Sequence, residues 1–331
     1  MTIVATTSPG FGRYGSVPDR LAEKGWTFVR CVDTSKPDGG LSEHLAEVDF
    51  IVAGLVRVTD ETLAAAPKLK AVLKHGVGVD SIDIPACTAR GVPVLNTPGA
   101  NAAAVAELAV GMMFAFARNI PAGHESVVTG AWKRTVGGEI GAKTLGIVGL
   151  GAIGRSLAKK AIGLGMRVVA SDLYPDRAFA AEHGIELLEL DELLKRADYV
   201  SLHVFGGADN AALINADRLA LMKPTACLLN LARGEVVDLD ALDAALTEGR
   251  LAGAGIDAYT VEPPDVSHPI FRQPRVVFTP HTGADTVESV ERVGLMNVED
   301  IETILAGGRP TRVLNPEVFE TEAFAARRAA A

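Results

Sequence analysis

The chain has 331 residues, enough for about two domains, and is 48% hydrophobic and 22% charged. This is the composition of an ordinary globular protein with a sizeable core. Its formal net charge of -9 argues against a nucleic-acid partner, because the phosphates of a nucleic acid require a basic protein surface.

The cysteines and the apolar segments exclude further classes of protein. Cys31, Cys87 and Cys227 stand singly, without the spacing of a metal site, and their small odd number suits a reducing cytoplasm. No basic segment precedes an apolar one at the N-terminus, so no secretory signal is expected. The most apolar stretch, 102–117, contains Glu107 and is too short to span a bilayer. We therefore expect a buried helix there, no metal and no membrane partner.

Strands and helices alternate over the first hundred residues. Strands are predicted at 2–6, 27–32, 50–53, 69–73 and 92–95. Helices are predicted at 18–25, 42–47, 62–66 and 85–90. Alternation of this kind predicts a parallel sheet with helices on both faces, so this part of the chain forms one α/β unit.

A second α/β pattern follows a linker at 96–101, a helix at 102–118 and an irregular arm at 119–141. Its strands are predicted at 145–148, 166–170, 187–188, 199–203, 227–230, 252–256 and 276–279. Helices are predicted at 190–196, 215–222, 239–248 and from 284 to about 305, and the Ala-rich tail beyond 316 is expected to fray. The predicted fold class is α/β, with doubly wound parallel sheets.

The stretch from 144 to 172 organises the second unit. A short apolar strand leads into Gly149, Gly151 and Gly154, a helix follows, and a second strand ends at Asp172. This is the order of a dinucleotide-binding βαβ unit, in which the helix N-terminus receives the pyrophosphate. A carboxylate at position 172 would accept hydrogen bonds from the ribose hydroxyls and repel a 2′-phosphate, which favours NAD over NADP.

Several strands of this unit end in polar residues, namely His203, Arg233, Asp257 and His281. In a doubly wound sheet, ligands bind outside the carboxyl ends of the strands. We therefore expect these side chains to converge near the cofactor, although His203 is better interpreted as a structural histidine.

Six motifs together resemble the D-2-hydroxyacid dehydrogenase family, and in particular its phosphoglycerate dehydrogenase-like branch. They are G-V-G-V-D-S-I-D (76–83), N-T-P-G-A-N-A-A-A-V-A-E (96–107), G-L-G-A-I-G-R (149–155), N-L-A-R-G-E-V-V-D (230–238), G-A-G-I-D-A-Y-T-V-E-P (253–263) and T-P-H-T-G (279–283). The resemblance covers most of the chain.

The resemblance implies catalytic roles for three residues. His281 would exchange the proton of the substrate hydroxyl, and Glu262 would pair with it, favouring the imidazolium and holding the ring in orientation. Arg233 would bind the substrate carboxylate through its planar guanidinium. The backbone amides of Val77 and Gly78 would meet the same carboxylate.

The resemblance also implies the cofactor and its contacts. NAD would touch Asp257 on its nicotinamide side, together with Ala152, Ile153, Leu231, Ala232 and Gly283. Lys74 replaces an arginine that is usual in this branch, and it would either neutralise a second anionic group on the substrate or be merely solvated. The run at 204–210 departs from the family pattern, which puts the adenosine side of the site in doubt.

The architecture implied by the family is split. Residues 1–98 and 285–331 would form a flavodoxin-like substrate domain, and 99–284 an inserted Rossmann-type NAD domain. Residues 102–140 would make the contact of a homodimer.

We therefore expect a cytoplasmic, NAD-dependent D-2-hydroxyacid dehydrogenase. Its small-molecule substrate would carry a second anionic group, as 3-phosphoglycerate does. Reduction of glyoxylate or hydroxypyruvate is the alternative within the same class. An NAD(H)-sensing binding protein, similar to the corepressors that share this fold, is the alternative from another class, and NADH-dependent partner binding without turnover would favour it.

Overall fold

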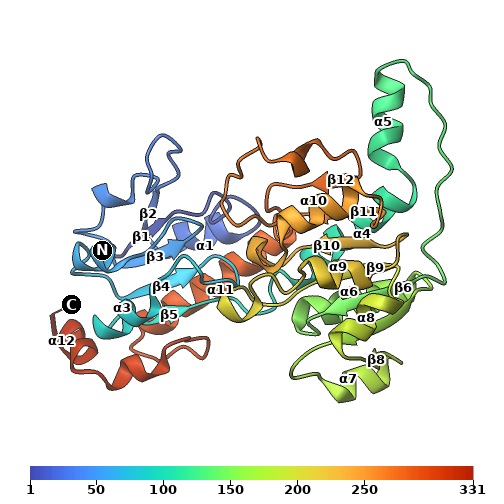
Figure 1. Ribbon diagram of the computed structural model, residues 1–331. Helices are drawn as coiled ribbons and strands as arrows, with labels where there is room; N and C mark the ends of the chain where they lie inside the picture. The colour runs from blue at the N-terminus through green and yellow to red at the C-terminus, as the bar shows by residue number, and fades with distance from the viewer. Residues whose placement is uncertain (331) are drawn as a thin grey trace. The chain divides into compact units, whose positions relative to one another are not determined.

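The computed structural model describes residues 1–330, and the chain forms two compact units (Figure 1). One unit combines Met1–Asn101 with the chain from Ala284 onward, and the other is Ala102–Gly283. The substrate and cofactor roles that we expect for these units stay predictions.

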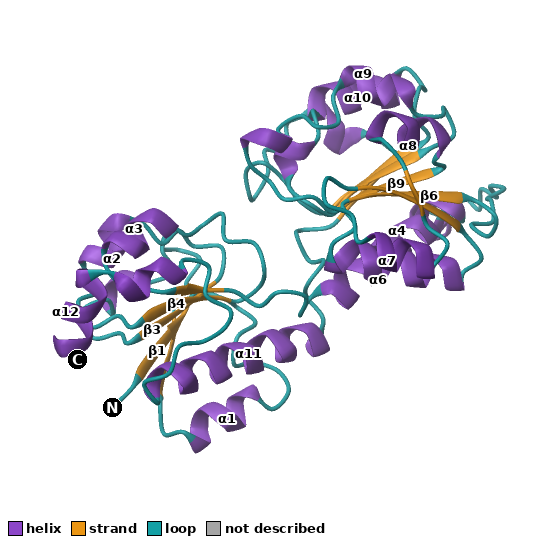
Figure 2. Ribbon diagram, turned by 90° about the horizontal axis from the view of Figure 1, so that it is seen from below, coloured by secondary structure: helices purple, strands orange, loops and turns teal. Residues whose placement is uncertain are grey.

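The first unit contains a parallel sheet of five strands in the order β2-β1-β3-β4-β5. The strands are β1 (Ile3–Thr6), β2 (Thr27–Arg30), β3 (Phe50–Ala53), β4 (Ala71–Lys74) and β5 (Val94–Leu95). The helices are α1 (Val17–Glu23), α2 (Asp60–Ala64), α3 (Ile84–Ala89), α11 (Val287–Leu305) and α12 (Glu322–Ala330), with 3₁₀ turns at Leu41–Glu43 and Pro316–Glu320. This strand order is flavodoxin-like, and Figure 2 shows α2 and α3 on one face of the sheet and α1 and α11 on the other.

The C-terminal segment is folded onto the first unit, so the expectation that the tail beyond 316 frays is wrong. Buried Asn315 accepts a hydrogen bond from the Val94 amide (2.8 Å) and donates to the Val92 carbonyl (3.1 Å). In α12, Arg327 donates to the carbonyl of Leu69 (2.9 Å). These are long-range bonds to backbone, and Ala-rich composition gives no sign of them.

The second unit contains a parallel sheet of seven strands in the order β12-β11-β10-β9-β6-β7-β8. The strands are β6 (Thr144–Val148), β7 (Arg167–Ser171), β8 (Glu186–Leu187), β9 (Tyr199–Leu202), β10 (Cys227–Asn230), β11 (Gly253–Ile256) and β12 (Val276–Phe278). The helices are α4 (Ala102–Ala117), α5 (Ile120–Val128), α6 (Ala152–Gly163), α7 (Arg177–Glu182), α8 (Leu190–Arg196), α9 (Ala216–Leu221) and α10 (Leu239–Thr247), with 3₁₀ turns at Ala208–Asn210, Gly234–Val236 and Pro269–Arg272. The order around β6 is that of a doubly wound dinucleotide-binding fold, and the predicted fold class is confirmed.

The alternation of side chains along β6 explains why both faces of this sheet are covered. Leu145 and Ile147 point into a core shared with α4 and α6, whereas Val148 belongs to the core on the opposite face. Gly146 lies under α8, where a Cβ would come within 2.5 Å of Leu193. Figure 2 shows α4, α6 and α7 on one face and α8, α9 and α10 on the other. Because every strand pair in this sheet is parallel, all the strands end at one edge.

The chain between α4 and β6 differs from the irregular arm that we expected, because it begins with helix α5. Asn119 adopts a left-handed conformation (φ 52°) and turns the chain out of α4, after which α5 continues without a buried face. No single helix within residues 1–330 is long and apolar enough to cross a membrane, but α4 and α5, bent by 61° from each other, would together meet the criterion of length and composition. The cytoplasmic location stays a prediction.

Candidate active site

The turn between β6 and α6 requires glycine at two positions and leaves a third open. Gly149 has a left-handed φ of 95°, and a Cβ there would lie 2.7 Å from the His203 carbonyl oxygen. A Cβ at Gly154 would lie 2.2 Å from the carbonyl oxygen of Gly149, so the helix could not approach the strand. At Gly151, by contrast, no atom of residues 1–330 outside its immediate neighbours lies within 4 Å of the Cβ position. The backbone at Gly151 is therefore open to a ligand.

The first turn of α6 faces this open position. Gly151 is the N-cap residue and supplies no side chain to cap the helix, so no side chain satisfies the leading amides, which include those of Ala152 and Ile153. Uncapped amides and the positive end of the helix dipole favour a phosphate group.

Asp172 is held beside the same turn. Its Oδ2 accepts a hydrogen bond from the Leu150 amide (2.6 Å) and its Oδ1 accepts one from the Tyr174 amide (2.8 Å). These bonds orient the carboxylate at the end of β7, one strand away from the glycine turn. The open glycine, the uncapped helix and the oriented carboxylate fit the pyrophosphate and ribose of a dinucleotide.

His281 and Glu262 are in direct contact. His281 Nδ1 lies 2.7 Å from Glu262 Oε1, which also accepts a hydrogen bond from the Tyr259 amide (3.1 Å). The side chains are 33% and 24% exposed, respectively. Because the carboxylate holds Nδ1, the Nε2 atom of the ring is the one left to face a substrate. The pairing expected from the sequence is therefore present in the structure, and its catalytic role stays a prediction.

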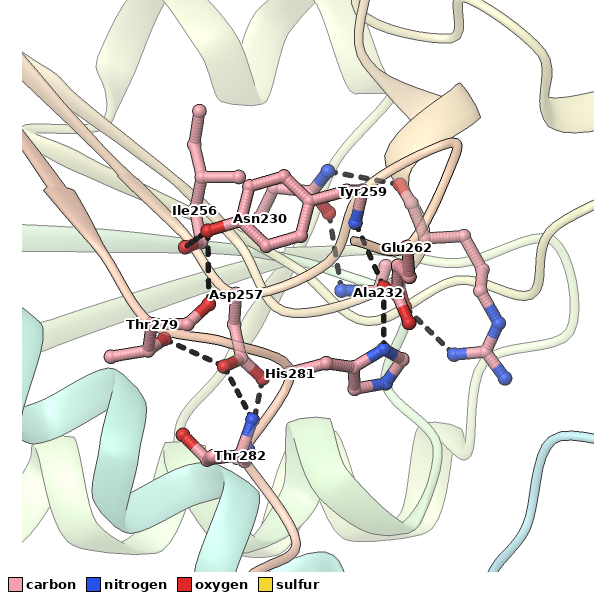
Figure 3. A network of polar contacts seen from close by, with 11 residues as sticks. Asn230, Ala232, Ile256, Asp257, Tyr259, Glu262, Thr279, His281 and Thr282 are labelled. Atoms are coloured by element: carbon pink, nitrogen blue, oxygen red, sulfur yellow. Dashed lines mark hydrogen bonds and ion pairs between the residues drawn. The ribbon is translucent and has the colours of Figure 1, made fainter. Parts of the chain in front are cut away.

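Asp257, at the end of β11, shapes the turn that carries His281 (Figure 3). Its Oδ1 accepts hydrogen bonds from Thr279 Oγ1 (2.6 Å) and the Thr282 amide (2.9 Å), and its Oδ2 accepts one from the Gly283 amide (2.9 Å). Both carboxylate oxygens are therefore engaged in the turn. The contact with the nicotinamide that we expected from Asp257 and Gly283 stays a prediction.

Arg233 follows β10 in a turn that is stabilised by hydrogen bonds and by contact with a neighbouring loop. The buried Asn230 side chain accepts a hydrogen bond from the Ala232 amide (3.1 Å) and donates to the Arg233 carbonyl (2.9 Å). The guanidinium of Arg233 itself donates to the Ala232 carbonyl through Nη1 (2.7 Å). A Cβ at Gly234 would lie 2.0 Å from the amide nitrogen of Thr260, so this turn touches the loop that carries Glu262. Leu231 and Ala232 are buried at its base.

Three residues that build this site were not predicted from the sequence. Asn230, Tyr259 and Thr279 all bond to backbone or to a site carboxylate, and Figure 3 shows them around Asp257 and Glu262. Two of them are polar residues next to the end of an apolar strand, as Asn230 is for β10 and Thr279 for β12. A polar residue at the end of an apolar strand was therefore the signal in the sequence that could have identified these two residues.

The departure at 204–210 packs against the Arg233 turn. A Cβ at Gly206 would lie 2.3 Å from Glu235 Oε1 and 2.9 Å from Arg233 Cγ, and the Gly207 amide donates to Glu235 Oε1 (3.2 Å). Phe205, which is 81% exposed, projects from this loop. The loop therefore supports the stem of Arg233 and presents an aromatic ring to solvent.

His203 has the structural character that we expected. Its Nε2 lies 2.9 Å from Ser201 Oγ, its Nδ1 is buried without a hydrogen-bond partner, and burial lowers the pKa of His203 to about 3. The ring is therefore neutral in the folded protein at physiological pH.

The pKa of His203 predicts a loss of stability in mild acid. The folded-state pKa is about 3 against an ordinary value of 6.5, so the unfolded chain binds one more proton between these pH values. The free energy of unfolding is therefore expected to fall by up to about 1.4 kcal/mol per pH unit as the pH drops below about 6.5, and to recover above it. Urea unfolding at pH 7.5 and pH 5.5 measures this effect. His203→Gln should show a shallower dependence on pH, and an unchanged slope would contradict the assignment.

The other residues predicted to contact the substrate lie in the first unit. Lys74 ends β4, is 7% exposed, and donates through Nζ to the Gly54 carbonyl and to Ser81 Oγ (3.4 Å). The loop that follows is half-buried at Val77 and Gly78, and the Val77 carbonyl accepts a hydrogen bond from Asn96 (2.9 Å). Their role toward a substrate stays a prediction.

Within residues 1–330, no group of three or more His, Cys, Asp or Glu side chains is placed to hold a metal ion.

Comparisons with known proteins agree with this geometry. Residues 110–283 match the NAD binding domain of the D-isomer specific 2-hydroxyacid dehydrogenases. The chain is 44% identical over 281 residues to a D-3-phosphoglycerate dehydrogenase of Mycobacterium tuberculosis, a match that covers 84% of this chain and 53% of that protein. It is 38% identical over 293 residues to a glyoxylate reductase of Thermococcus litoralis, covering 86% and 88% of the two chains.

A solved structure with the same fold is D-lactate dehydrogenase from Aquifex aeolicus, complexed with NAD and lactic acid. It has a TM-score of 0.80 and 28% sequence identity, and the match covers 92% of this chain and 96% of that one. The chain spans about half the length of the phosphoglycerate dehydrogenases that it matches. From the family model and these relatives together, the chain belongs to the D-isomer specific 2-hydroxyacid dehydrogenase family.

Proposed function

We propose that this protein is an NAD-dependent D-2-hydroxyacid dehydrogenase. The observation that carries the proposal is the 2.7 Å contact between His281 and Glu262, in the same unit as the open glycine turn and Asp172. A histidine oriented by a carboxylate is suited to proton exchange with a substrate hydroxyl near neutral pH. NAD, when bound, supplies the nicotinamide carbon that exchanges a hydride with C2 of the acid.

The chain's own residues would divide the remaining work. With Nδ1 held by Glu262, the protonated ring of His281 donates from Nε2 to the carbonyl oxygen of a 2-keto acid, and in the reverse direction the neutral ring accepts that proton. Arg233 binds the carboxylate of the acid, and its turn is braced by Asn230. Gly151, the first turn of α6 and Asp172 would hold the cofactor.

Asp172 is proposed to select NAD, which predicts the behaviour of an Asp172→Ala variant. Loss of a charged acceptor for the ribose hydroxyls should raise the Kd for NADH about tenfold or more and reduce the discrimination against NADPH. Fluorescence titration with both nucleotides measures this change. Asp172→Asn, which keeps an acceptor oxygen without the charge, should lose discrimination while retaining more of the affinity for NADH. Unchanged NADH binding in both variants would show that another residue meets the ribose.

Two substrate classes remain in competition. Similarity to phosphoglycerate dehydrogenases supports an acid with a second anionic group, such as 3-phosphoglycerate, which Lys74 would neutralise. The second candidate is a compact acid such as glyoxylate or hydroxypyruvate. The burial of Lys74 favours it, because the ammonium group already donates to Gly54 and Ser81 within the first unit. The match to a glyoxylate reductase over most of both chains supports this candidate too.

The experiment that tests the proposed function is NADH oxidation by the purified protein with a panel of 2-keto acids. The panel contains 3-phosphohydroxypyruvate, hydroxypyruvate, glyoxylate and pyruvate. Turnover of one of them establishes a dehydrogenase and its substrate class. Tight NADH binding without turnover of any acid would instead favour the NAD(H)-sensing protein.

We also propose that the protein is a homodimer through residues 102–140. The support is an exposed apolar surface on α5 and the arm that follows, formed by Ile120, Val127, Val128, Trp132 and Val136. Burial of such a surface against a second copy would remove it from water. Sedimentation of the protein and of a Trp132→Glu, Val136→Glu double variant tests the assembly, because the variant should sediment as a monomer.

A further inference from the structure

Tyr259 joins the two members of the His281–Glu262 pair through separate polar groups. Its backbone amide donates to Glu262 Oε1 (3.1 Å), and its hydroxyl donates its single proton to the carbonyl oxygen of Thr279 (2.9 Å), shared with that of Ile256 (3.3 Å). Figure 3 shows the phenol reaching from the Glu262 loop toward the ends of β11 and β12. We propose that the hydroxyl of Tyr259 is a positioning group that sets the geometry of the His281–Glu262 pair, an inference that rests on the proposed function.

The Thr279 carbonyl is the point through which Tyr259 reaches His281. The same oxygen accepts the hydrogen bond of the His281 amide (3.0 Å). His281 has a left-handed backbone (φ 53°), a conformation that non-glycine residues hold only when the surroundings enforce it. A donor on the Thr279 carbonyl fixes the acceptor that closes this turn. The direction in which the imidazole points therefore depends on the hydroxyl of Tyr259.

The phenol is suited to act as a permanent donor. Burial, with the nearby charges of Asp257 and Glu262, raises the pKa of Tyr259 to about 12, so the hydroxyl keeps its proton over the working range of the enzyme. The ring stacks on Phe271 at a centroid distance of 6.1 Å, which fixes the plane of the phenol. A phenylalanine would keep this packing and lose only the shared hydrogen bond.

The alternative is that the hydroxyl merely satisfies two carbonyl groups in the interior. A tyrosine of that kind would affect the free energy of unfolding, but it would leave the His281–Glu262 pair unchanged. The two interpretations therefore differ in whether kcat falls while KM stays constant, and in whether the two loops loosen together.

The test compares Tyr259→Phe with wild type and with a matched Tyr199→Phe variant. Tyr199 lies in β9 of the same unit and outside this network. Turnover of the preferred keto acid should fall about fivefold in Tyr259→Phe, with KM and the Kd for NADH within about twofold of wild type. Tyr199→Phe should change none of these values.

Hydrogen exchange of the protein without cofactor gives a readout that does not depend on activity. In Tyr259→Phe, exchange should become faster in both 257–265 and 279–284, and not in Tyr199→Phe. An unchanged kcat, or unchanged exchange in these two segments, would overturn the proposal. If wild type turns over no keto acid, the proposed function is wrong. Unaltered exchange in both segments would show separately that Tyr259 does not position the pair.

Discussion

An Arg233→Ala variant is expected to lose about a thousandfold in kcat/KM for the preferred keto acid, with little change in the Kd for NADH. The proposed contact between the guanidinium and the substrate carboxylate is charge-assisted, and each such hydrogen bond contributes about 1.5–3 kcal/mol. Two of these bonds correspond to roughly a hundredfold to ten-thousandfold in rate. Steady-state kinetics and fluorescence titration of NADH measure the two quantities separately.

The turn that carries Arg233 should survive this substitution. Asn230 bonds to the backbone of residues 232 and 233, and the alanine variant keeps that backbone. Arg233→Lys should recover only part of the activity, because an ammonium group cannot make the two parallel hydrogen bonds of a planar guanidinium. Arg218→Ala is the matched control, since Arg218 pairs with Asp191 (3.0 Å) in the same unit. Activity of Arg233→Ala within tenfold of wild type would exclude Arg233 as the carboxylate ligand.

The fold was predictable because its signal is local. Each strand is a short apolar run, and the run at β6 is followed by glycines that can be assigned to a tight turn, an open backbone and a close helix packing. Helix α5 escaped prediction because none of its residues is buried, so no packing against the rest of its unit shapes its sequence. Helix α12 escaped because its anchoring bonds run from Arg327 to backbone carbonyls some 260 residues earlier.

The site was predictable as a set of residues but less so as a set of contacts. Strand ends and motif positions indicated Arg233, Glu262 and His281, and the structure joins the last two. The bonds of Asp257 to the turn at 279–283 depend on how that turn folds, which no local pattern specifies. The same holds for the burial of Lys74. Polar side chains that bond to distant backbone were thus the features that the sequence could not supply.

A His281→Ala variant is expected to lower kcat about a thousandfold while NADH still binds. The variant removes the group that we propose to donate a proton to the developing alkoxide, and general acid catalysis contributes about a hundredfold to ten-thousandfold. NADH binding should persist because Gly151 and Asp172 lie at the ends of other strands. Rapid mixing with the preferred keto acid and excess NADH measures the loss at the step of hydride transfer.

His268→Gln provides a closely matched control for that loss. His268 lies in the same unit and its Nε2 contacts Asp240 Oδ1 at 3.0 Å, so it is also a histidine beside a carboxylate. Its partner lies on α10 rather than in the Glu262 loop. If kcat falls equally in both variants, the loss reflects general damage to the unit and not a proton donor.

Glu262→Gln separates the orienting carboxylate from the proton donor. Glutamine can still accept the hydrogen bond from His281 Nδ1, so the loss in kcat should be smaller than in His281→Ala. The neutral amide cannot balance the positive charge of a protonated ring, so kcat should still fall below that of wild type. If Glu262→Gln keeps the wild-type kcat, the carboxylate acts only by position, and the 2.7 Å contact serves to orient the ring.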